Sequence, residues 1–209
     1  MIGDTKGPVE VPEEVGTMPG QVVGSLIAAG FGAVYIVVNA GSLPPGVQWS
    51  LRAVAAAALC FVVIAVSRRA AGHRPAAGRP DGPVFPRTYW LVVGVEAALL
   101  FGGVRVVAGP LATPEAGVAW VSVVVGVHFF ALARIFDQAF FNLLGAAISL
   151  CGVAALLLAF TGAGLPSVDL VGGVAPGLLL LASALWGIQR RPVAAATPHS
   201  SFMADQGGR

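Results

Sequence analysis

Residues 140–160 read FFNLLGAAISLCGVAALLLAF, a run of 21 positions without a charged side chain. About 20 apolar residues in a helix cross the hydrocarbon core of a bilayer, because each residue advances the helix by about 1.5 Å. A helix on the surface of a soluble protein keeps one polar face, which this run does not have. The stretch therefore predicts a membrane span.

Five further runs of similar length and composition surround this one. The six predicted spans are residues 20–39, 49–66, 88–107, 117–133, 140–160 and 170–188. Segments rich in Gly, Pro or polar residues separate them, as turns require. Pro176 is expected to kink the last span, which membrane helices tolerate. The sequence thus predicts a single six-helix transmembrane domain over residues 20–189, with no room for a soluble catalytic domain.

The overall composition agrees with a protein that folds in lipid. Of its 209 residues 56% are hydrophobic and 11% are charged, and the mean hydropathy is +0.84. A soluble domain carries about 25% charged residues. The net charge of +2 is too small to indicate a nucleic-acid partner. We expect an all-α integral membrane bundle whose partner is the lipid bilayer.

The positive charges predict the orientation of the bundle. Most lie before the first span, between the second and third, between the fourth and fifth, and after the last: Lys6, Arg68, Arg69, Arg74, Arg79, Arg87, Arg134, Arg190 and Arg191. Arg52 and Arg105 lie near the opposite side, but within helix ends, where long side chains reach the interface. With six spans all of these segments fall on one side, and cytoplasmic loops are the ones that collect Lys and Arg. We expect residues 1–19 and 190–209 to be disordered cytoplasmic tails of a multi-pass protein of the inner (plasma) membrane.

Two ionisable residues lie deep in predicted spans. Glu96 stands about eight residues into the third span, and His128 about six residues before Arg134 in the fourth. The helical rise places both side chains roughly 10 Å from the cytoplasmic boundary. A short connection makes these two spans antiparallel neighbours, so we expect Glu96 and His128 to meet at one depth.

Three readings of Glu96 and His128 stay open. They form a hydrogen bond that sets the register of two helices, or they hold or pass a proton or ion, or they do not pair. The first is favoured. Two ligands are too few for a metal site, and no nucleophile–base pair or nucleotide fingerprint is evident. We therefore predict no catalytic, metal-binding or cofactor-binding residue, and no cofactor.

Small residues in the third span predict close helix packing. Gly94, Ala98 and Gly102 recur at four-residue intervals, a spacing that lets a second helix approach. Glu96 falls on nearly the opposite face. A helix with a packing stripe on one side and a carboxyl group on the other is expected to be buried from both sides, so the third span is predicted to be central.

The first span carries a second stripe, and the two cysteines lie within apolar runs. The stripe follows alternating spacings of three and four residues: Ser25, Ala28, Gly32, Tyr35 and Asn39. We expect Gly32 and Asn39 to pack against neighbouring helices. Cys60 and Cys151 are expected to be small buried hydrophobic residues, because no metal-binding spacing or disulfide pattern is present.

One stretch resembles a known motif. Residues 126–136, GVHFFALARIF, are similar to a motif of small bacterial polytopic membrane proteins, which often have Pro where Ala131 stands. A vaguer likeness extends through the first and third spans. That family has no assigned activity, so the resemblance draws attention to His128 and implies no mechanism.

Two classes of function remain. The chain is a non-catalytic membrane component, such as a partner subunit, sensor or envelope factor, which is slightly favoured. Alternatively it is a small permease or a proton- or ion-coupled carrier that uses Glu96 and His128. A carrier should show a polar cavity reaching Glu96, whereas a packing role should show Glu96 closed against His128. A homo-oligomer or a membrane partner protein is compatible with either class.

Overall fold

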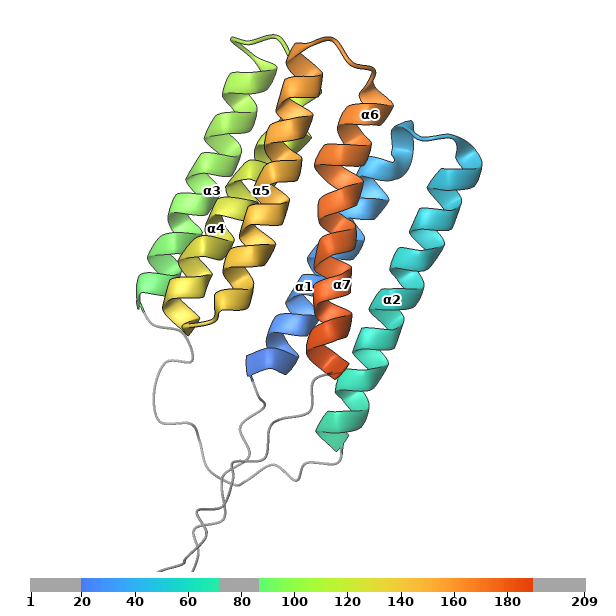
Figure 1. Ribbon diagram of the computed structural model, residues 1–209, viewed down its shortest axis with the longest axis vertical. Coiled ribbons are helices and arrows are strands. Elements are labelled where there is room, and N and C mark those ends of the chain that lie inside the picture. The colour runs from blue at the N-terminus through green and yellow to red at the C-terminus, as the bar shows by residue number, and fades with distance from the viewer. Residues whose placement is uncertain (1–19, 72–86, 190–209) are drawn as a thin grey trace, which may run out of the picture.

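A computed structural model describes residues 20–71 and 87–189, and all regular structure within these ranges is helical. The elements are α1 (Gly20–Asn39), the 3₁₀ turn η1 (Ala40–Ser42), α2 (Pro45–Ala71), α3 (Arg87–Ala108), α4 (Ala116–Phe136), α5 (Ala139–Phe160), α6 (Leu165–Asp169), the π-helical segment η2 (Leu170–Val174) and α7 (Ala175–Gln189). The helices run up and down one bundle (Figure 1). The predicted tails, residues 1–19 and 190–209, lie outside the described residues.

Six helical stretches are long and apolar enough to cross a membrane, which confirms the predicted fold class and number of spans. They are Gly24–Ser42, Pro45–Arg69, Trp90–Ala108, Ala116–Phe136, Ala139–Phe160 and Leu165–Gln189. Two begin earlier than predicted, because Pro45 and Pro166 stand in the first turn of a helix rather than in a loop. A proline fits there, since the first turn has no partner for its missing N–H.

The described helices carry arginines at both ends, with Arg52 near the start of α2 and Arg105 in the last turn of α3, at the end where α1 finishes. Arg68, Arg69 and Arg134 lie in the last turns of α2 and α4, at the end where α1 begins, which we call the inner end. Arg69 also donates a hydrogen bond to the carbonyl of Ile188 and so ties α2 to α7. Lys6, Arg74, Arg79, Arg190 and Arg191 lie outside the described residues. Which side of a membrane the inner end faces stays a prediction.

The helices form two groups, each with its own core of buried side chains. A further cluster of buried side chains lies between the two groups. Figure 1 shows α1, α2 and α7 on one side and α3, α4 and α5 on the other. The first group shares a core that includes Ala29, Ile36, Val62, Leu181 and Ala184. The core of the second includes Val107, Ala119, Ala155 and Val168. Tyr35, Leu144, Ile148 and Leu180 pack together between the two groups.

Helices α4 and α5 approach each other most extensively, through small residues. On each helix three buried small residues recur at seven-residue intervals: Ala119, Gly126 and Ala133 on α4, and Gly145, Gly152 and Ala159 on α5. A Cβ at Gly126 would lie 2.5 Å from the backbone nitrogen of Ser149. Only glycine allows this approach of two backbones.

Helices α1 and α7 meet in the same way, and here the expected packing residues of the first span are found. A Cβ at Gly32 would lie 2.8 Å from the carbonyl oxygen of Gly177. A Cβ at Gly173 would lie 2.3 Å from that of Asn39, so Asn39 fills the space that this glycine leaves. Gly32 and Asn39 therefore both lie in helix contacts.

The sixth span changes from α- to π-helical geometry in its outer part, just before Pro176. Residues Leu170–Val174 form the π-helical segment, and α7 begins at Ala175. Pro176 has no N–H to give to the carbonyl of Gly172, four residues earlier. The hydroxyl of Ser122 on α4 donates to that carbonyl instead. The outer part of the span, α6, packs on α4 and α5, whereas α7 packs chiefly on α1 and also contacts α2 and α5.

Helix α3 lies at the edge of the bundle, so the prediction that it is central is wrong. It packs substantially against α4 alone. A Cβ at Gly94 or Gly102 would meet nothing within 4 Å, and Ala98 is exposed. The face that contacts α4 is instead that of Glu96 and Gly103. The small residues Gly94, Ala98 and Gly102 would allow another helix to pack closely against α3. In the described part of the chain no helix packs against that face.

The outer surface is apolar. Phe101 is 76% exposed and Leu150 is 71% exposed, as only a hydrocarbon solvent favours. Cys60 is exposed on this surface and Cys151 is partly buried. The prediction that both are buried is therefore wrong, because an apolar side chain in lipid has no need to turn inward.

Candidate functional site

The structure brings together the two residues that the sequence paired. Glu96 lies nine residues after Arg87, the first residue of α3, and His128 lies eight residues before Phe136, the last of α4. The helical rise puts both about 12–14 Å from the inner ends of their helices. The Nδ1 atom of His128 is 2.9 Å from Oε2 of Glu96.

This contact has the length of a hydrogen bond but not its alignment. Nδ1 of His128 makes no well-directed hydrogen bond to any protein atom. The side chains of His128 and Glu96 keep 13% and 19% of their surface accessible. The pair is thus close and mostly covered.

The chemistry of the pair is that of one shared proton. A carboxylate beside an imidazolium and a carboxylic acid beside a neutral imidazole contain the same number of protons. Moving the proton between Glu96 and His128 changes a charged pair into a neutral one without a change of net charge. Lipid disfavours separate charges, so this pair tolerates a membrane interior better than either group alone.

A second link between α3 and α4 lies nearer the outer end. The indole Nε1 of Trp120 donates to the carbonyl of Leu99 at 3.0 Å. The ring lies over Gly103, where a Cβ would come within 1.8 Å of Nε1. The Glu96–His128 contact and the indole hydrogen bond therefore hold α3 at two points along its length.

Two buried hydroxyl groups stand between the helix groups, close to the pair. Tyr35 on α1 is 8% exposed, and its neighbours include the hydroxyl of Ser122 and the carboxyl of Glu96, which acts on it electrostatically. Ser122 is fully buried and donates to the carbonyl of Gly172. The Tyr35 hydroxyl lies within hydrogen-bonding reach of the Ser122 hydroxyl, but Oη makes no well-aligned hydrogen bond to a protein atom.

Tyr35 belongs to the predicted packing stripe of the first span, whereas Ser122 belongs to no predicted stripe or pair. A signal for Ser122 was present: Pro176 leaves the carbonyl of Gly172 without its helical donor, and a serine at matching depth in a neighbouring span can replace that donor. Identifying it required knowing that α4 packs beside the broken span.

The polar residues at the outer end satisfy each other locally. Both Nε and Nη2 of Arg52 donate to the carbonyl of Val37, at 3.3 and 3.1 Å. Its guanidinium also lies 5.4 Å from the centre of the Trp49 ring. Nδ2 of Asn39 donates to the carbonyl of Tyr35 at 2.8 Å. These contacts connect the end of α1 to the start of α2. The polar groups of Arg52 and Asn39 are therefore used in holding this turn together.

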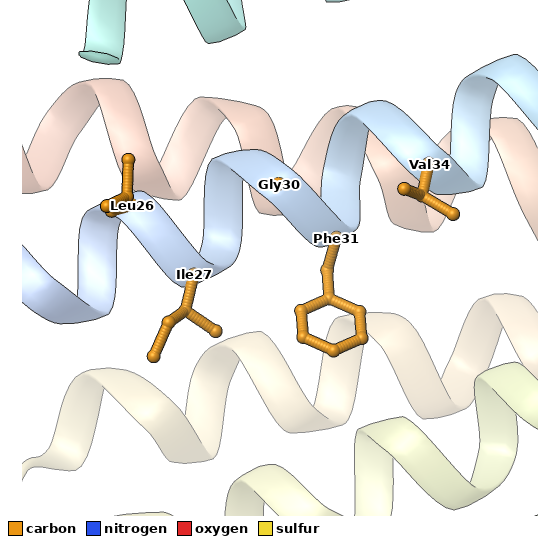
Figure 2. Close-up of a pocket in the computed structure, with 5 residues that line it drawn as sticks. All are labelled: Leu26, Ile27, Gly30, Phe31 and Val34. Carbon is orange, nitrogen blue, oxygen red and sulfur yellow. The ribbon is translucent and has the colours of Figure 1, made fainter.

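Two pockets on the described helices are apolar, and neither is lined by Glu96 or His128. One of about 290 Å³ lies along α1 at Gly30 and is lined by Leu26, Ile27, Phe31 and Val34. Figure 2 shows Leu26 on one side of α1 and Ile27 with Phe31 on the other. The second, about 380 Å³, is lined by Gly103, Val106, Val107, Leu111, Trp120, Leu156 and Phe160.

Among residues 20–71 and 87–189 no three His, Cys, Asp or Glu side chains gather as metal ligands would. No protein-family model, no curated protein and no solved structure matches the chain. The resemblance of residues 126–136 to small bacterial membrane proteins therefore stays an expectation.

Proposed function

We propose that this protein is a non-catalytic integral membrane component of the plasma membrane, of the kind that serves as a partner subunit, sensor or envelope factor. The proposal rests on one observation. Glu96 and His128 lie against each other between two adjacent helices, 2.9 Å apart, and line neither of the two apolar pockets described above.

The position of α3 supports a structural role for the pair. This helix is covered by α4 on one side and presents the rest of its surface outward. A peripheral helix loses little apolar burial in lipid when it separates, so polar contacts carry more of its attachment than they would in water. Glu96 and His128 supply such a contact at the inner half of α3.

A small proton- or ion-coupled carrier is the second candidate, and one observation favours it. The sixth span contains a π-helical segment at Leu170–Val174, next to the buried hydroxyl of Ser122. Short π segments within α-helices often mark functional sites.

Liposomes reconstituted with the purified protein distinguish the two candidates. Decay of an imposed pH gradient and of a Na⁺ or K⁺ gradient is compared for wild type, Glu96→Gln and empty liposomes. We expect the three to decay at the same rate, while Glu96→Gln lowers the unfolding midpoint in detergent. Faster decay in wild type that Glu96→Gln abolishes would establish the carrier instead.

The matched control is Glu115→Gln, at the outer start of α4, where no ion pair forms within the described part of the chain. It should leave both the gradients and the unfolding midpoint unchanged. Loss of stability in Glu115→Gln as large as in Glu96→Gln would remove the special role of the Glu96–His128 contact.

A further inference from the structure

Four buried polar side-chain atoms in the described part of the chain have no well-aligned protein partner: Oη of Tyr35, Oγ of Ser42, Nδ1 of His128 and Oγ of Ser149. Ser42 ends the η1 turn that follows α1. Hydrocarbon offers nothing to replace a missing hydrogen bond, so such groups are strongly disfavoured there. An unpaired buried polar group in a folded protein is usually explained by a bound water, an ion or a function.

Two of these atoms belong to one polar site. Oη of Tyr35 lies within electrostatic reach of Glu96 and beside Ser122, and Glu96 contacts His128. The residues of this site come from α1, α3 and α4. The carbonyl of Gly172 in η2 also belongs to it, because it accepts a hydrogen bond from Ser122. Ser149 packs against Gly126 on the other side of α4 and stands apart.

Few other ionisable groups face this site. On α3, Arg105 lies nine residues from Glu96 toward the outer end. On α4, Arg134 lies six residues from His128 toward the inner end. Both arginines are exposed. Helix α5 adds the partly buried thiol of Cys151, α6 adds Asp169 at the outer end, and α7 adds none. Glu96, His128 and Tyr35 are therefore the ionisable side chains that the described helices bring together at this site.

We propose that Glu96, His128, Tyr35 and Ser122 form a hydrated proton-binding site inside the membrane. Water supplies the hydrogen bonds that Tyr35 and His128 lack, since a buried water makes two to four such bonds. A hydronium ion gives one proton to the pair and leaves as water, and the reverse step releases the proton. This inference rests on the geometry of the site and needs no transport.

Infrared difference spectroscopy of the protein in lipid nanodiscs tests this site. Lowering the pH should produce a carboxylic-acid C=O band that is absent from Glu96→Gln. In D₂O the band should shift to lower frequency within the mixing time, because water reaches the acid. Tyr35→Phe keeps the ring and should slow that exchange at least several-fold. Ser183→Ala, whose hydroxyl bonds to Leu180 within α7, should behave as wild type.

Three results would overturn the proposal. Spectra of wild type and Glu96→Gln that coincide at every pH would mean that Glu96 does not change protonation. A band that fails to shift after a day in D₂O would mean that the site is dry. An exchange rate in Tyr35→Phe equal to wild type would remove Tyr35 from the site.

If Glu96→Gln does not fold, His128→Gln serves in its place, because it retains the carboxyl group of Glu96. This variant should move the pH at which the carboxylic-acid band appears. A band that appears at the same pH as in wild type would overturn the proposal. Proton flux in liposomes would contradict the proposed function without affecting this site.

Discussion

At the scale of single residues, Gly102 and Gly103 show how neighbours on one helix differ in role. Gly103 lies beneath the Trp120 indole, whereas a side chain at Gly102 would meet nothing within 4 Å. A helix turns by 100° per residue, so adjacent residues face different surroundings. Gly103 allows α3 to approach α4, and Gly102 faces outward.

Valine at these two positions makes a matched test. Gly103→Val should displace Trp120, break its hydrogen bond to Leu99 and cost about 1–3 kcal/mol, the range for an overpacked contact. Gly102→Val should cost less than about 0.5 kcal/mol, as surface changes do. Unfolding followed by tryptophan fluorescence in detergent measures both; equal losses would contradict the placement of α3.

At the scale of elements, the break in the sixth span is stabilised by another helix. Ser122→Ala removes the donor to Gly172 and should cost about 1–3 kcal/mol, the penalty for an unpaired buried carbonyl. Pro176→Ala restores a backbone N–H that can serve the same carbonyl. The loss from Ser122→Ala should therefore shrink by at least half in the Pro176→Ala background.

A double-mutant cycle measures this coupling. Unfolding free energies of the wild type, the two single variants and the double variant are compared under one condition. Additive losses would show that Ser122 and Pro176 act independently, and the explanation of the π segment would then be wrong. Ser183→Ala in both backgrounds provides the control, since its partner is Leu180 in its own helix.

The contact between α4 and α5 gives a second prediction at this scale. Gly126→Ala would place a Cβ 2.5 Å from the backbone nitrogen of Ser149, and a backbone cannot move aside as a side chain can. We expect a loss of about 1–3 kcal/mol. Gly117→Ala on the same helix meets nothing within 4 Å and should be neutral or stabilising by up to about 1 kcal/mol. Thermal unfolding in detergent compares them.

At the scale of the whole molecule, the prediction concerns the orientation of the bundle. The turns after α1, α3 and α5 lie at the outer end, opposite the end where α1 begins. The positive-inside rule predicts that this end faces the exterior. Thr113→Cys, in the turn after α3, should react in intact cells with a maleimide that cannot cross the membrane. Ser67→Cys, near the inner end of α2, should react only after the membrane is opened.

A reporter that fluoresces only in the cytoplasm gives an independent reading when it is fused after Arg191. Fluorescence is the expected result. Labelling of Ser67→Cys in intact cells, together with a dark reporter, would reverse the orientation while leaving the six spans in place. The native Cys60 and Cys151 are replaced by Ala first, so that only the introduced thiol reacts.

The sequence by itself determined the solvent, the number of spans and the depth of the polar pair. Apolar runs of about 20 residues leave a chain little alternative to lipid. Depth follows from counting, because every helical residue adds the same rise. For this reason Glu96 and His128 were correctly expected at one level, and the structure places them 2.9 Å apart.

Only the tertiary structure decided which faces are covered. In lipid an apolar face has no preference for the interior, so the outward stripe of Gly94, Ala98 and Gly102 and the inward stripes of α4 and α5 look alike in sequence. The partners of Tyr35 and Ser122 depend on how α1, α4 and the broken sixth span cross. These contacts are set by the packing of small side chains between helices, which no single helix encodes alone.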